Sequence, residues 1–197
     1  MIRVLCLILA LAVPGSAAAS GVVLVNPLNG HSYLLVGGLM SWAQAEQQAA
    51  ARTENGQRCY LATLTSPAET AWVTANLLGS VNQAWIGLYQ GPNAPHPDAD
   101  WRWVTGEGFG GYTNWGPGEP GDGGNDPDIG FEDCGTVNKS GEWNDLYCTA
   151  EVPAVVECGA FPVSTAPAAS DLGLMALALA LAAAGSRSVA RARYRSR

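Results

Sequence analysis

The stretch from Asn114 to Cys134 restricts the fold of this chain more than any other part of the sequence. It contains six glycines, three prolines and six acidic residues, and it has no basic residue. The whole segment from Gly87 to Cys134 shows little sign of regular structure, and long segments of this kind in compact domains usually carry function. The stretch is either a solvated surface loop or a folded cage of carboxylates around a cation. Composition by itself favours the loop.

The sequences at both ends of the chain are typical of sorting signals. Residues 1–19 combine one basic residue, an apolar run and small residues near a cleavage point, which is the layout of a secretory signal peptide. Residues 160–171 are rich in proline, alanine and serine and predict a linker. Residues 172–197 hold an uncharged apolar run and then five arginines. We therefore expect an exported protein, on the cell surface or outside the cell, whose C-terminal segment is a membrane anchor or a sorting signal.

The body between these ends, residues 20–159, has the length of one domain with a sizeable core. It carries 16 acidic and 4 basic residues, which give a net charge of −12. Such a charge repels nucleic acid and suits cations and neutral ligands. We therefore expect no nucleic-acid partner.

Four cysteines remain in the body once the signal peptide is set aside. An even number in an exported domain predicts two disulfides, with three possible connectivities. No two of these cysteines have the C-x-x-C spacing of a zinc knuckle, and the two histidines are far apart in the sequence, so zinc is not expected. The four cysteines are Cys59, Cys134, Cys148 and Cys158.

The order of predicted elements is that of an α+β domain. Both predicted helices begin at a serine cap, and the second, from Ser66, has proline at its first position and Glu69 completing a capping box. No helix is expected in the body after residue 79, whereas residues 172–197 are expected to hold an apolar helix before the arginine-rich tail. We expect helices over residues 41–56 and 66–79, and strands over residues 30–36, 59–64, 84–89, 100–106, 135–138, 141–145 and 154–158.

Catalytic motifs are missing from the sequence. It has no Ser/His/Asp order, no Cys/His pair and no glycine loop that follows a strand and opens a helix. A carboxylate pair of the glycosidase kind is formally available among the many acidic residues. We nevertheless expect no enzymatic activity.

Several short motifs occur in the order and at the approximate spacing of one family. The chain resembles a C-type lectin-like domain from about residue 29 to residue 158. The resemblance implies a double-looped α+β fold with two helices, a small antiparallel sheet, a long irregular loop region and two disulfides, Cys59–Cys158 and Cys134–Cys148. In the family the first cysteine usually lies within the first helix, whereas Cys59 directly precedes a strand. The motifs are WIGL (85–88), WRWVTG (101–106), TNW (113–115), GEP (118–120), EDC (132–134) and WND (143–145).

The C-terminal tail resembles the tripartite sorting signals of some exported bacterial proteins. Those signals consist of a short motif, an apolar helix and an arginine cluster. The Pro-Glu-Pro motif of the best-known class is absent from this chain.

The resemblance also implies a Ca²⁺ site in the acidic stretch. Its ligands would be the residues that match the family's sugar-binding site, and the Glu119–Pro120 bond would be cis. The family motif EPN has become EPG here, so Gly121 lacks the asparagine side chain. The matching ligands are Glu119, Glu132, Asn144 and Asp145, and the candidates to replace the asparagine are Asn125, Asp122 and Asp126. The candidates for an auxiliary ion site are Asp98, Asp100, Asp122 and Asp133, although a solvated loop is favoured for Asp98 and Asp100.

The implied function is carbohydrate binding through the ion, with two adjacent sugar hydroxyls as additional Ca²⁺ ligands. The same four residues would contact the sugar. In the family EPN accompanies mannose-like selectivity and QPD galactose-like selectivity, and EPG is neither. The alternative is a Ca²⁺-independent surface domain of the same fold that binds protein partners or has a structural role.

Overall fold

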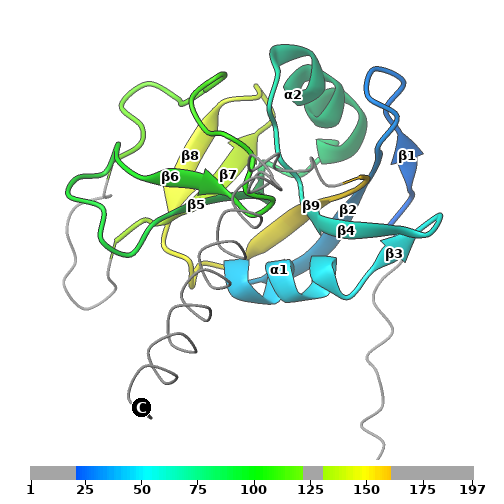
Figure 1. Ribbon diagram of the computed structural model, residues 1–197, viewed down its shortest axis with the longest axis horizontal. Coiled ribbons are helices and arrows are strands. Elements are labelled where there is room, and N and C mark those ends of the chain that lie inside the picture. The colour runs from blue at the N-terminus through cyan, green and yellow to red at the C-terminus, as the bar shows by residue number, and fades with distance from the viewer. Residues whose placement is uncertain (1–20, 122–130, 161–197) are drawn as a thin grey trace, which may run out of the picture. The chain divides into compact units, whose positions relative to one another are not determined.

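The last strand of the domain lies in the middle of its sheet. The structure, a computed structural model, describes residues 21–121 and 131–160. The strands run in the order β1-β2-β9-β5-β7-β8, while β4 also pairs with β9, β6 with β5, and β3 with β4 (Figure 1). Their bounds are β1 Leu24–Val25, β2 Ser32–Met40, β3 Thr53–Glu54, β4 Gln57–Leu61, β5 Gln83–Gln90, β6 Trp101–Trp103, β7 Cys134–Asn138, β8 Trp143–Leu146 and β9 Val152–Cys158.

The predicted α+β class and the predicted strands are confirmed, but the sheet is mixed rather than purely antiparallel. Strand β5 pairs with β9 in parallel at Trp85 and Ala154, and every other pairing of named strands is antiparallel. The sequence pattern of a strand does not reveal the direction of its neighbour. The parallel pair joins the N-terminal and C-terminal strands to the loop-bearing half of the domain.

The first helix, α1, is shorter than predicted. It spans Trp42–Ala50 and begins at the expected cap, Ser41, which forms a reciprocal capping box with Gln44. The chain then leaves the helix and forms the hairpin β3–β4, with positive φ at Asn55 and Gly56. Asn-Gly is the favoured pair for a tight two-residue hairpin turn, so these two residues end a hairpin strand instead of the helix.

The second helix begins and ends where the sequence indicates. Helix α2 spans Pro67–Val73 and continues as the π-helical turn η1 (Thr74–Leu78), which stops at Gly79 with φ +48°. Helix α2 lies above the β2–β9 pair in Figure 1 and α1 lies below it. The Ser66 hydroxyl accepts from the backbone N–H of Glu69, as a capping box requires, but the Glu69 carboxylate turns elsewhere.

Both predicted disulfides are present. Cys59 lies within β4 rather than before a strand, and it faces Cys158 as its partner on the antiparallel strand β9, which explains how it forms the long bridge. Cys134 at the start of β7 is bonded to Cys148 after β8. On a loop-entropy model, bridges closing about 100 and about 15 residues contribute roughly 4.7 and 3 kcal/mol.

The core is rich in tryptophan. Trp85 and Trp143 are fully buried, and Trp103 packs edge-on against Trp143 with ring centroids 5.5 Å apart. Trp101 is buried as well, so all four rings belong to the packed interior. Trp115 packs against Trp101 at 4.8 Å. The tryptophans therefore hold the loop region to the sheet.

Two buried glutamates are joined by hydrogen bonds between β2, α2 and β9. Glu69 and Glu157 are 5% and 2% exposed, and we call them the closed pair. The Tyr33 hydroxyl lies between them, 2.5 Å from Glu69 Oε1 and 3.1 Å from Glu157 Oε1. His31 Nδ1 lies 2.6 Å from Glu157 Oε1. Burial raises the pKa of Glu69, and the hydrogen bond to Glu157 raises the pKa of His31.

The outer oxygens of the closed pair accept hydrogen bonds from the chain between β4 and α2. Glu157 Oε2 accepts from the backbone N–H and the hydroxyl of Thr63, and Glu69 Oε2 accepts from the same two groups of Thr65. All four carboxylate oxygens therefore have donors inside the protein.

The predicted signal peptide, linker and tail lie outside the described residues, apart from Ala160. Within residues 21–121 and 131–160, no helix is long and apolar enough to cross a membrane.

Candidate functional site

The long loop is attached to the sheet just before its acidic part. Trp115 forms a parallel bridge with Trp143 at the start of β8. The backbone N–H of Gly116 donates to the Trp143 carbonyl at 2.8 Å, and the Trp143 N–H donates to the Asn114 carbonyl at 2.7 Å. The loop residues that follow are therefore held beside Asn144 and Asp145 of β8.

A tight turn then brings Glu119 to Asp145. The Glu119 N–H donates to the Gly116 carbonyl at 3.0 Å, and the Glu119–Pro120 bond is cis, as the resemblance implied. The Gly121 N–H donates to the Asp145 carboxylate, 3.0 and 3.2 Å from its two oxygens. The carboxyl group of Glu119 lies close enough to that of Asp145 to raise the pKa of Asp145. We call Glu119 and Asp145 the open pair.

Asp145 is held in an unfavourable environment for a carboxylate. It is 1% exposed, and burial, followed by the nearby carboxyl of Glu119, raises its pKa from the usual 3.8 to about 7. A bound cation would offset both effects, since an opposite charge favours the ionised form of each carboxyl. The residues present therefore fit a cation.

Asn144 adds an amide beside this pair. Its nitrogen donates to the Asp145 carbonyl oxygen at 2.5 Å. Rotating the Asn144 amide by 180° would exchange its nitrogen and oxygen, which would place the amide oxygen beside the Asp145 carbonyl oxygen. Carboxylate, amide and carbonyl oxygens are the ligands that Ca²⁺ takes in proteins.

Among the described residues, the other predicted carboxylate ligands, Glu132 and Asp133, form no metal cluster with the open pair. Glu132 and Asp133 are partly buried and precede β7, and the Asp133 carbonyl accepts from the Gln90 N–H. In the described ranges, no three His, Cys, Asp or Glu side chains come together to hold a metal, so Glu132 does not complete a three-carboxylate cluster with the open pair. The candidates Asn125, Asp122 and Asp126 lie outside the described residues.

The role of Gly121 is one that sequence reasoning missed. A Cβ atom there would lie 3.0 Å from the Gly118 carbonyl oxygen and 3.6 Å from Glu119 Oε2. The turn therefore favours glycine, and its N–H takes a direct part in the site. The signal in the sequence is the pair of glycines, Gly118 and Gly121, on either side of Glu-Pro.

Two aromatic residues near the site are packing groups. Tyr112 and Trp115 meet the Trp143 ring edge-on, with centroids 5.4 and 5.8 Å away. Asp98 and Asp100, two candidates for an auxiliary ion site, pair instead with His96 and Arg102. This agrees with the solvated loop that the sequence favoured for them.

Comparison with known proteins places this geometry in one family. The Lectin C-type domain model matches residues 39–158. The human C-type lectin domain family 10 member A is 33% identical over 121 residues, 61% of this chain. The chain spans 34% of the length of that relative.

Solved structures show the same fold. The C-type lectin CEL-I from Cucumaria echinata is 28% identical with a TM-score of 0.54, and the match covers 66% of this chain and 90% of that one. The cow C-type carbohydrate-recognition domain of CD23, solved in the presence of the oligosaccharide GlcNAc2Man3, is 27% identical with a TM-score of 0.52, covering 64% and 86%. With the family model matching more than half of its length, the chain belongs to the C-type lectin domain family.

Proposed function

We propose that this domain is a Ca²⁺-dependent carbohydrate-binding module. The observation that carries the proposal is the open pair: a buried aspartate with a raised pKa and a glutamate, brought together beside Asn144 at the end of a long acidic loop. Family membership supports it, because one structural relative is a carbohydrate-recognition domain solved in the presence of an oligosaccharide.

The residues of the site have separable tasks. Glu119, Asp145 and Asn144 would hold the ion, and the candidates Asn125, Asp122 and Asp126 would supply further oxygens. Glu132 would join them by moving towards the open pair. A bound Ca²⁺ takes six to eight oxygens, and two adjacent sugar hydroxyls can be among them. The Gly121 N–H orients the Asp145 carboxylate at 3.0 Å. The same carboxylates and amide accept hydrogen bonds from, or donate them to, the hydroxyls of the sugar.

The affinity of a single site is expected to be low. A shallow site that recognises two hydroxyls has a dissociation constant of about 1 mM, or about −4 kcal/mol. Useful binding then depends on several sites acting together. We extend the proposal to export and to tethering or sorting through residues 172–197, which would place the domain among surface glycans.

The alternative function is a Ca²⁺-independent domain that binds a surface protein. One observation favours it: the Gly121 N–H already donates to both oxygens of Asp145, so the turn is held without an ion. On this reading the site is vestigial, and the proton that Asp145 retains takes the place of the cation.

Calcium titration separates the two functions. We expect the purified protein to release or absorb heat on titration with Ca²⁺, and to gain about 2.7 kcal/mol of stability at 100 times the dissociation constant. Asp145→Asn should abolish both effects, because it removes the buried charge. The matched control, Asp98→Asn, changes an exposed carboxylate away from the site and should leave both effects intact.

Glycan binding provides the second readout. On a glycan array, binding by the multimerised protein should require Ca²⁺ and disappear with a chelator and in Asp145→Asn. If Ca²⁺ produces neither heat nor stabilisation, or if glycan binding persists in chelator, the Ca²⁺-dependent function is wrong and the alternative stands.

A further inference from the structure

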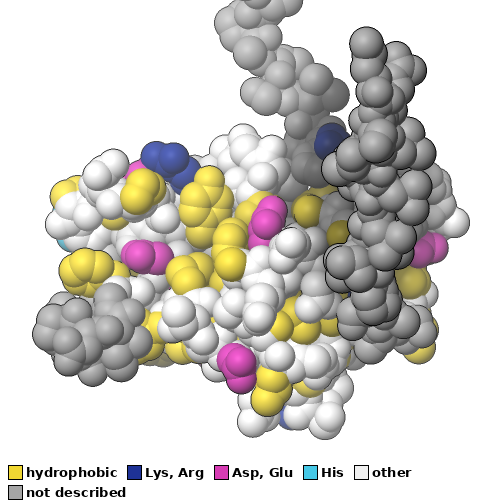
Figure 2. Space-filling model, turned by 90° about the horizontal axis from the view of Figure 1, so that it is seen from below, with side chains coloured by type: hydrophobic (Ala, Val, Ile, Leu, Met, Phe, Trp, Pro, Cys, Tyr) yellow, Lys and Arg dark blue, Asp and Glu magenta, His cyan; other side chains and the backbone are white. Residues whose placement is uncertain are grey.

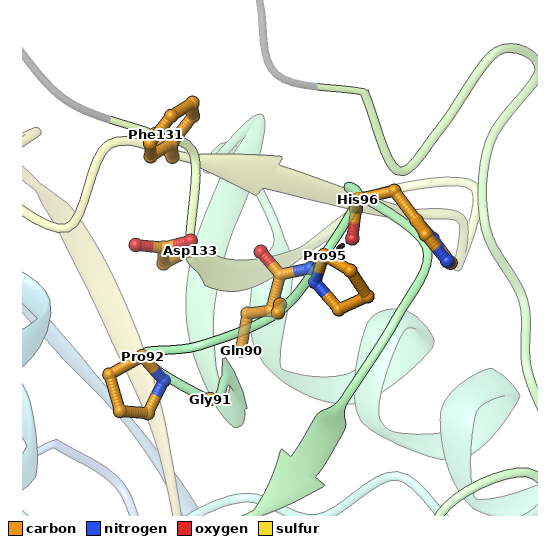
Figure 3. Close-up of a pocket in the computed structure, with 8 residues that line it drawn as sticks. Gln90, Gly91, Pro92, Pro95, His96, Phe131 and Asp133 are labelled. Atoms are coloured by element: carbon orange, nitrogen blue, oxygen red, sulfur yellow. Dashed lines mark hydrogen bonds between the residues drawn. The ribbon is translucent and has the colours of Figure 1, made fainter.

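An exposed aromatic ring forms one wall of a small cavity. Phe131 is 60% exposed and lines, together with Asp133, a cavity of about 160 Å³ (Figure 3). Gln90, at the end of β5, and Pro92 and Pro95 from the segment that follows complete most of the lining. None of these residues belongs to the open pair.

The floor of this cavity is rigid. Gln90 is 7% exposed, and its side-chain nitrogen donates to the carbonyls of His96, Pro97 and Ala99 at 3.0, 2.9 and 2.8 Å. Its backbone N–H donates to the Asp133 carbonyl at 2.8 Å. The three side-chain bonds fix the amide, and the backbone bond fixes the position of the residue. Figure 3 shows the amide oxygen of Gln90 on the side of Phe131 and Asp133.

The chemistry of the lining favours a cation. Gln90 and Asp133 present acceptor oxygens, and the prolines have no N–H to offer. No lysine or arginine is among the described lining residues, and the His96 ring points away in Figure 3 and pairs with Asp98. A cation would also meet the face of an exposed aromatic ring, an arrangement that is attractive in itself.

The net negative charge of the domain also favours binding of a cation. The described residues hold 13 acidic and 4 basic side chains, a net charge of −9. In Figure 2, the face seen from below shows acidic side chains scattered among apolar and uncharged ones, with few basic groups. A positively charged segment of a partner is therefore attracted before it makes contact.

The size of the cavity selects the kind of ligand. At about 160 Å³ it is smaller than the roughly 300–1,000 Å³ of pockets for drug-sized molecules. It has room for about five water molecules, at about 30 Å³ each. That space suits one protein side chain. We propose that this cavity binds a lysine or arginine side chain of a protein partner, with its charged group between Gln90 and Asp133 and its stem against Phe131.

A pair of matched small molecules tests this proposal on the full-length protein. N-acetyl-lysine methylamide carries the cation, and N-acetyl-norleucine methylamide has a similar length without it. Amide chemical shifts are followed by NMR during each titration, in chelator, so that the outcome does not depend on Ca²⁺ binding at the open pair. We expect saturable shifts at Gly91 and Ala94 with the lysine compound, and binding about tenfold weaker with norleucine. N-acetyl-arginine methylamide should match lysine.

Variants of the lining locate the binding. Asp133→Asn and Phe131→Ala should each weaken lysine binding severalfold, while Glu151→Gln, at an exposed site outside the cavity, should not. Phe131 is largely exposed, so its loss leaves the fold intact. The proposal is overturned if lysine and norleucine behave alike, if the shifts spread over the acidic surface and survive both variants, or if Ca²⁺ alone produces the same shifts and displaces the lysine compound.

Discussion

The domain contains two pairs of carboxyl groups that differ in how their oxygens are hydrogen-bonded. In the closed pair, Glu69 and Glu157 are buried in the half of the domain formed by β2, β9 and α2. In the open pair, Asp145 is equally buried, but its partner Glu119 comes from the long loop. Both pairs contain a carboxyl group whose pKa is raised by burial, namely Glu69 and Asp145.

The difference lies in the donors around each pair. Every oxygen of the closed pair has a donor within the protein: the two Oε2 atoms accept from backbone N–H groups and the two Oε1 atoms from side chains. His31 also supplies a positive charge when it is protonated. In the open pair, the Gly121 N–H donates to the Asp145 carboxylate, and the carboxyl groups of Asp145 and Glu119 lie close to one another. A buried pair that is satisfied from within is part of the fold. A pair that still lacks a positive partner is suited to a ligand.

Removing a glutamate from the closed pair should have the largest effect. Glu157→Ala leaves the Thr63 N–H and His31 without the acceptor that they share, and the Tyr33 hydroxyl keeps only Glu69. Loss of one partner from a buried charged network costs about 3–5 kcal/mol. Urea denaturation in chelator measures this as a fall in the free energy of unfolding.

The matched substitution in the open pair is its control. Glu119→Ala removes a partly buried carboxyl that faces another carboxyl. The free energy of unfolding should change by no more than about 0.5 kcal/mol without Ca²⁺. Equal losses in Glu119→Ala and Glu157→Ala would show that the two pairs do not differ in kind.

A smaller effect is expected from the tyrosine that separates the closed pair. Tyr33→Phe removes the hydroxyl that lies 2.5 Å from Glu69 Oε1, and this buried oxygen then keeps only the 3.1 Å bond from the Asn29 side-chain nitrogen. The expected loss is about 1–3 kcal/mol. Tyr112→Phe is the control, because this tyrosine is partly exposed and its ring packing on Trp143 is kept. A loss in Tyr112→Phe as large as that in Tyr33→Phe would contradict the role given to the network.

The smallest expected effects are changes in the free energy of unfolding with pH. The open pair and the closed pair differ in the pH range over which this change occurs. The pKa of Asp145 is raised in the folded protein, so its contribution to stability is present below its usual 3.8 and is lost as pH rises to about 7. The pKa of His31 is also raised, so its contribution is present below 6.5 and is lost as pH rises through the folded value.

Urea denaturation across a pH series, without Ca²⁺, measures both windows. The stability of the native sequence should fall relative to that of Asp145→Asn between about pH 4 and pH 7. Relative to His31→Gln, it should fall above pH 6.5. If the free energies of unfolding of Asp145→Asn and the native sequence change in parallel with pH, the pKa of Asp145 is not raised in the folded protein.

Much of the architecture was predictable because its signals are local. Serine caps, the stop at Gly79 and the apolar runs of the strands depend on neighbouring residues. The end of α1 was missed, since the Asn55-Gly56 turn competes with a helix that has good propensity up to that point. The sequence predicts that Glu69 completes a capping box, but its carboxylate accepts a hydrogen bond from Tyr33 instead. This was not predictable, because Tyr33 lies on a strand that is distant in the sequence.

Taken alone, the sequence determined the family resemblance, the two cysteine pairs that the resemblance implied, and the oxygen-rich chemistry of the acidic loop. The tertiary structure decided which carboxylates meet, because Glu119 and Asp145 are 26 positions apart and come together only when Trp115 is bound to β8. It also decided the role of Gly121, whose missing side chain leaves room for the Gly118 carbonyl. Distances between residues far apart in sequence depend on the packing of the whole sheet, and no local pattern encodes them.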